Sequence, residues 1–157
     1  MMEYANNTEK ANTAEGIEAR LMGEAREAFA SAGDPAQLAP LSLAYMGDTV
    51  YDLFVRTMLL ETTTLTVHGL HQRAAKLVCA KAQAAAFRAI EPLLSEKELS
   101  VYKRGRNSHI GTVPKSASIM DYRTATGLEA LIGFLYLSGE NERLNEIMRL
   151  ILSESAE

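Results

Sequence analysis

Two long apolar stretches, each interrupted by one acidic residue and by glycine, constrain the fold of this 157-residue chain most strongly. The first, residues 41–55, contains Gly47 and Asp48, and the second, residues 125–137, contains Glu129 and two glycines. A carboxylate is rarely fully buried unless it is paired or bound to a cation. Glycine inside a helix costs about 1 kcal/mol relative to alanine, which indicates a close backbone approach there. We therefore expect two mostly buried helices whose acids face one another.

The rest of the chain also shows helical spacing, without the alternation of apolar and polar residues that is typical of strands. The predicted fold class is therefore all-α. Ser95 and Glu98 have the spacing of a capping box, and residues 108–118, with Gly111 and Pro114, are predicted to be a loop. Helices are expected over about 13–32, 38–60, 67–94 (one helix or two abutting ones), 95–106, 122–138 and 141–153.

Composition places the chain among globular proteins, with 47% hydrophobic and 23% charged residues. Residues 1–36 are predicted to be a partly helical N-terminal extension, and residues 37–157 a single domain. Neither apolar stretch is long and uninterrupted enough for a membrane span, and the N-terminus lacks the pattern of a signal peptide. The single cysteine, Cys79, fits a reducing cytoplasm.

Charge is distributed unevenly along the chain, whose net charge is −4. Residues 72–123 contain ten Lys and Arg and four Asp and Glu, whereas the remainder contains six and sixteen. Clustered Lys and Arg are typical of proteins that contact phosphates, so the basic middle indicates a polyanionic partner. A solvated helical face is the alternative interpretation.

The two acids suggest a chemistry if they do meet. Asp48 and Glu129 would then hold a hard cation such as Mg²⁺, which takes one or two protein carboxylates and accepts phosphate oxygens in its other positions. Such a site suits hydrolysis of a phosphodiester bond. The alternative is that each acid is satisfied by a hydroxyl or an arginine. Asp52, by contrast, is expected to form an ordinary helix ion pair with Arg56. The small residues expected to let the two helices approach are Gly47, Gly127, Ala130 and Gly133.

Donor-bearing side chains gather at the end of the expected helix 95–106, in the loop after it and at the start of the next helix. Guanidinium groups match phosphate geometry well, and a glycine and an asparagine accompany them here. An exposed basic helix end without function is the alternative. The candidate phosphate-contacting residues are Lys103, Arg104, Arg106, Asn107, Lys115 and Arg123.

Four motifs in this order resemble Mini-ribonuclease III of bacteria, a ribonuclease III catalytic domain without a double-stranded-RNA-binding domain. They lie at residues 43–52, 104–107, 114–115 and 122–133. The resemblance implies a ribonuclease III-like all-α homodimer that cleaves double-stranded RNA with Mg²⁺, for which Mn²⁺ can substitute. It also implies maturation of the large-subunit (23S) ribosomal RNA precursor in the cytoplasm, and it leaves room for a ribosomal protein as partner.

The same resemblance assigns roles to the two acids. Asp48 matches the family's catalytic aspartate and Glu129 its catalytic glutamate, both as metal ligands. Ala44 and Thr126 stand where longer ribonuclease III enzymes carry two further acids. The absence of these two acids matches the Mini subfamily. A non-catalytic helical RNA-binding module, in which both acids are structural, is the alternative function, and a helical scaffold without nucleic acid is a third. Metal-dependent cleavage and salt-sensitive RNA binding distinguish the three.

Overall fold

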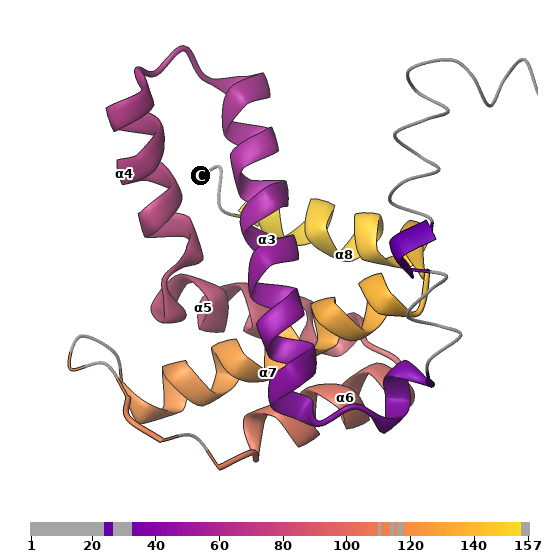
Figure 1. Ribbon diagram of the computed structural model, residues 1–157. Helices are drawn as coiled ribbons and strands as arrows, with labels where there is room; N and C mark the ends of the chain where they lie inside the picture. The colour runs from indigo at the N-terminus through magenta and orange to yellow at the C-terminus, as the bar shows by residue number, and fades with distance from the viewer. Residues whose placement is uncertain (1–23, 27–32, 110, 114, 116–117, 155–157) are drawn as a thin grey trace, which may run out of the picture. The chain divides into compact units, whose positions relative to one another are not determined.

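The computed structural model describes residues 24–26, 33–109, 111–113, 115 and 118–154 (Figure 1). The chain divides into two compact units, residues 1–34 and residues 35–157. The helix expected over about 13–32 falls almost entirely outside the described residues. Within that range only residues 24–26 are described, and they are helical. Everything below concerns the second unit.

The described part of this unit is built from helices, and no strand occurs in it. This confirms the all-α prediction. In chain order the elements are η1 (Pro35–Gln37), α3 (Pro40–Thr62), α4 (Val67–Val78), α5 (Ala80–Ile90), η2 (Glu91–Leu93), α6 (Glu96–Arg106), α7 (Ile119–Leu137) and α8 (Asn141–Glu154).

Helix α7 is the centre of the unit, with α3, α5, α6 and α8 packed around it (Figure 1). Twelve of its 19 residues are buried. Its apolar residues occur on all sides, which is typical of a helix surrounded by protein. None of the described helices combines the length and the apolarity that a membrane crossing requires.

Helix α3 crosses α7 and then extends beyond it, where α4 runs back alongside (Figure 1). Only seven of its 23 residues are buried, so the expectation of a mostly buried helix is wrong for α3. The exposed side carries large apolar residues, among them Tyr45, which is 81% exposed. Asp48 lies on this open side as well.

The helix boundaries follow local signals. The expected capping box is present, since Ser95 accepts from the Glu98 N–H and the Glu98 carboxylate accepts from the Ser95 N–H. The extended backbone of Cys79 divides the segment 67–94 into α4 and α5, which is the second of the two alternatives predicted. Helix α7 begins at residue 119, three residues earlier than expected, because the Ser118 hydroxyl caps it by accepting from the Asp121 N–H.

Candidate active site

Asp48 on α3 and Glu129 on α7 flank the point where these two helices touch backbone to backbone. A Cβ atom on Gly47 would overlap the carbonyl oxygen of Glu129, and a Cβ atom on Gly133 would overlap the carbonyl oxygen of Leu43. Neither position leaves room for a side chain, so glycine is required at both. On α3 the crossing therefore lies at Gly47, directly before Asp48 in the chain, and on α7 it lies at Glu129 itself.

Two of the four small residues assigned to this crossing serve another one. A Cβ atom on Gly127 would lie 2.6 Å from Cδ2 of Tyr102, and one on Gly105 would lie 2.7 Å from Cβ of Ala130. Gly127 and Ala130 therefore pack against α6, and their assignment to the α3 contact is wrong. The sequence could not distinguish the two crossings, because α7 presents small residues on more than one side.

The two carboxylates interact electrostatically and lie in different surroundings. Glu129 is partly buried, and burial is the main cause that raises its pKa from 4.5 to about 7, followed by the negative charge of Asp48. Asp48 is exposed to solvent. A cation placed between them would offset both the repulsion and the loss of hydration.

The donor set fits a magnesium ion. Among the described residues, no Lys or Arg forms an ion pair with Asp48 or Glu129. No group of three or more His, Cys, Asp or Glu that could hold a metal occurs among those residues either. Two carboxylates with open space on the Asp48 side match the way Mg²⁺ is bound in proteins, through few protein oxygens and several waters.

Two further side chains adjoin Glu129 and were missed in the sequence. Tyr51, one turn after Gly47, is 1% exposed, and its pKa is raised by burial and then by the nearby Cys79 and Glu129. Gln83 on α5 is also 1% exposed. Its position within the alanine-rich run 80–86 was a signal, because a long amide is out of place on a face made of alanine.

The Gln83 amide lies close enough to Glu129 to lower its pKa, which partly opposes the effect of burial. However, neither its Nε2 nor its Oε1 has a partner at the distance and angle of a hydrogen bond among the described residues. The amide therefore lies beside the carboxylate and influences it, but outside the distance and angle of a hydrogen bond. Leaving a buried polar group unpaired costs about 1–3 kcal/mol.

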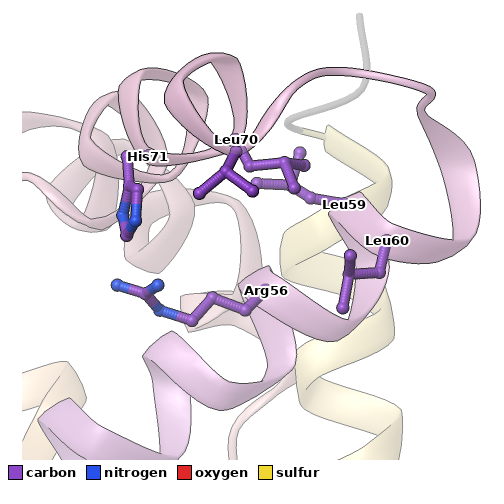
Figure 2. A pocket seen from close by; sticks show the side chains of 6 residues that line it. Arg56, Leu59, Leu60, Leu70 and His71 are labelled. Atoms are coloured by element: carbon purple, nitrogen blue, oxygen red, sulfur yellow. The ribbon is translucent and has the colours of Figure 1, made fainter.

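Asp52 forms the ion pair expected for it, since its carboxylate accepts from Nε of Arg56 at 2.7 Å. Arg56 also lines a hollow of about 170 Å³ between α3 and α4. Figure 2 shows its guanidinium beneath the ring of His71, with Leu70 and Leu59 to the right of that ring. The other lining residues are aliphatic and none is an acid, so this hollow is separate in chemistry from the two-carboxylate site.

The candidate RNA-contacting residues of α6 lie in different situations. Lys103 and Asn107 are exposed along an open groove of about 510 Å³, which Arg104 also lines. The Arg104 guanidinium donates to the carbonyl oxygens of Ala36 and Leu38 at 3.1 and 3.2 Å. Arg104 thereby holds the segment before α3, a structural role that was not expected for it.

The remaining candidates are less constrained. Arg106 lies over the ring of Tyr102, 5.6 Å from its centre, and donates to Oδ1 of Asn107. Lys115 and Arg123 are exposed, and their side chains form no hydrogen bond or ion pair among the described residues. Their participation in RNA binding stays a prediction.

Comparison with known proteins identifies a matching family and several relatives. The Ribonuclease III domain model matches residues 41–140, which include both acids. Mini-ribonuclease 3 of Clostridium tetani is 48% identical over 76% of this chain and 80% of that protein. Mini-ribonuclease 3 of Symbiobacterium thermophilum is 47% identical over 74% of this chain and 89% of its own length.

The fold is also similar to that of a solved structure. A crystal structure of a protein from Fusobacterium nucleatum superposes with a TM-score of 0.70 at 30% identity, covering 76% of this chain and 95% of that one. The family match spans the region that holds the helix crossing and its two carboxylates. The chain belongs to the ribonuclease III family and, within it, to the Mini-ribonuclease 3 group.

Proposed function

We propose that this protein is a metal-dependent endoribonuclease that hydrolyses phosphodiester bonds in double-stranded RNA, with Mg²⁺ held by Asp48 and Glu129. One observation carries the proposal. The two carboxylates meet at a glycine-to-glycine helix crossing, and no cationic side chain among the described residues pairs with them. A fold that brings two acids together without compensation is suited to binding a cation.

The two acids occupy different positions at the site. When bound, the cation supplies an activated water and stabilises charge on the phosphate. Asp48 is exposed and therefore stands on the side from which a substrate can approach. Glu129 is held from behind by the packing of α7, so its backbone is fixed by the core. Both act as carboxylate ligands in their ionised form.

The substrate class is supported by the basic middle of the chain. Duplex RNA is recognised mainly through its shape, phosphates and 2′-hydroxyls. Lys103 and Asn107 along the α6 groove, with Arg106, Lys115 and Arg123, supply donors for such contacts. We assign the ribosomal RNA precursor as substrate, and the cytoplasm as location, on the resemblance to the Mini-ribonuclease 3 group.

We also propose that the protein acts as a homodimer. The open side of α3 exposes Tyr45 and, one turn earlier, Leu41, which is 44% exposed. Exposed apolar residues grouped on one helix face are typical of interfaces. A symmetric pair of chains provides two carboxylate sites, one for each strand of a duplex.

The deciding experiment compares the wild type with Asp48→Asn on a long double-stranded RNA, in Mg²⁺ and in excess chelator. We expect cleavage by the wild type in Mg²⁺ only, and a loss on the order of a thousandfold in the variant, since a carboxylate ligand of the cation is removed. Asp52→Asn is the matched control, because Asp52 lies on the same helix but pairs with Arg56.

Wild-type cleavage rates in Asp48→Asn would refute the assignment of the site. Salt-sensitive RNA binding by the wild type without any cleavage in Mg²⁺ would favour the non-catalytic binding module instead.

A further inference from the structure

Gln83 is the most anomalous polar side chain in the described part of the molecule. It is 1% exposed, and both polar atoms of its amide lack a hydrogen-bond partner there. Buried amides are paired in nearly all native structures, so an orphaned one requires an explanation. An aliphatic side chain of similar length would avoid the unpaired polar atoms at this position.

The surroundings of Gln83 supply the explanation. Helix α5 packs along α7, and this contact brings the Gln83 amide beside the Glu129 carboxylate. The amide favours the ionised form of that carboxylate but is not in hydrogen-bond geometry with it. Gln83 is therefore a buried, unpaired amide that lies beside one of the two acids of the site.

An amide is chemically suited to support a metal-binding carboxylate. It donates a hydrogen bond without bringing a positive charge, whereas Lys or Arg would cancel the charge that attracts a cation. Groups that hydrogen-bond to metal ligands orient them, and their loss typically weakens metal binding about 10–100-fold.

We propose that Gln83 is a positioning residue, whose Nε2–H donates to the Glu129 carboxylate when that carboxylate holds the cation and thereby fixes its orientation towards Asp48. This inference rests on the proposed function, because it assigns a support to the same site. A hydrogen bond to Glu129 would pair a buried amide that has no partner among the described residues.

The test replaces Gln83 with methionine, which has nearly the same length and no amide. We measure thermal unfolding without metal, and Mg²⁺ binding to the RNA-free protein by calorimetry. Gln83→Met should raise the melting temperature by about 3 °C, because an unpaired polar group is removed. The Kd for Mg²⁺ should rise about tenfold, and the Mg²⁺ concentration that half-saturates cleavage should rise with it.

Phe87→Leu on the same helix is the control, since Phe87 is buried and stacks on Tyr102 with ring centres 3.7 Å apart. This variant should lower the melting temperature and leave the Kd for Mg²⁺ unchanged. If Gln83 had only a structural role, Gln83→Met would also leave the Kd for Mg²⁺ unchanged.

Two outcomes would overturn the inference, and they can be told apart. If the wild type binds Mg²⁺ and cleaves RNA while Gln83→Met binds Mg²⁺ within about twofold of it, only the positioning role fails. If the wild type neither binds Mg²⁺ nor cleaves RNA, the proposed function fails and the positioning role fails with it.

Discussion

Asp48 and Glu129 carry the same charge but are held in different ways. Asp48 is exposed, whereas burial and the Asp48 charge raise the pKa of Glu129 to about 7. In the metal-free protein, Glu129 is therefore the acid that opposes folding at neutral pH. A bound cation would reverse this effect because it favours the ionised form.

This difference predicts an unusual dependence of stability on pH. Between the unfolded pKa of 4.5 and the folded pKa of about 7, the folded chain binds more protons at Glu129 than the unfolded chain does. The free energy of unfolding should therefore fall as the pH rises through this range. Glu129→Gln should remove this contribution.

Denaturant unfolding in chelator at about pH 5 and about pH 8 measures the effect. Glu129→Gln should be the more stable protein at the higher pH and should lose this advantage at the lower one. An advantage that does not change with pH would show that the carboxylate keeps an ordinary pKa.

At the scale of helices, the site depends on the crossing of α3 and α7. Gly47 and Gly133 let the two backbones touch, and this contact sets the spacing of the acids. The same two helices could not pack at this distance with alanine at either position.

We therefore predict that Gly47→Ala destabilises the protein by about 3 kcal/mol, because the added methyl group meets backbone that cannot move aside. This outweighs the gain of about 1 kcal/mol that alanine brings in helix propensity. Gly69→Ala is the matched control, since its Cβ would meet mainly the Leu65 side chain, at 3.3 Å. Equal stability of the two variants would mean that the crossing is looser than described.

An ion pair between Glu98 and Arg143 joins α6 to α8. The Glu98 carboxylate accepts from Nε and Nη2 of Arg143 at 2.7 and 2.9 Å, and it also caps α6. The hydrogen bond from Arg143 is the main cause that lowers the pKa of Glu98. The stability from this pair is present above the unfolded pKa of 4.5 and is lost as the pH falls through the lower folded pKa.

Arg143→Met should therefore lower the free energy of unfolding by about 2 kcal/mol at neutral pH, because it leaves a buried carboxylate without its partner. The gap between wild type and variant should close as the pH falls through the lowered folded pKa of Glu98, below which Glu98 is protonated in both proteins. Urea unfolding across this pH range measures the difference in free energy of unfolding between the two proteins. A difference that persists in acid would show that the variant loses packing rather than the ion pair.

At the scale of the whole molecule, the open side of α3 has no partner among the described residues of the chain. It presents Asp48 together with large apolar side chains, so an interface on this side would lie next to the site. Dimer formation and assembly of the RNA-binding surface would then be linked.

Tyr45→Asp should convert the proposed dimer to a monomer, because it places a charge in an apolar interface. Tyr45 is 81% exposed, so the fold of the monomer should remain intact by circular dichroism. Light scattering should report twice the chain mass for the wild type and for Leu93→Asp, a control at another exposed apolar residue. A dimeric Tyr45→Asp protein would place the interface elsewhere.

The sequence by itself determined the helical class and most helix ends, and it indicated Asp48 and Glu129 as the candidate acids. Period, caps and breakers are local signals, which is why the Ser95 capping box and the end of α7 near Gly139 could be read directly. The pair Asp52 and Arg56 was also predictable, because both lie on one turn of one helix.

Only the tertiary structure decided which small residues lie at the crossing of α3 and α7 and which lie at the contact of α6 and α7. It also decided that Arg104 holds the segment before α3 and that Gln83 lies beside Glu129. These features depend on contacts between helices that are distant in the chain. A helical pattern specifies which residues share a face, but the neighbour of that face is selected by how all the helices fill the core together.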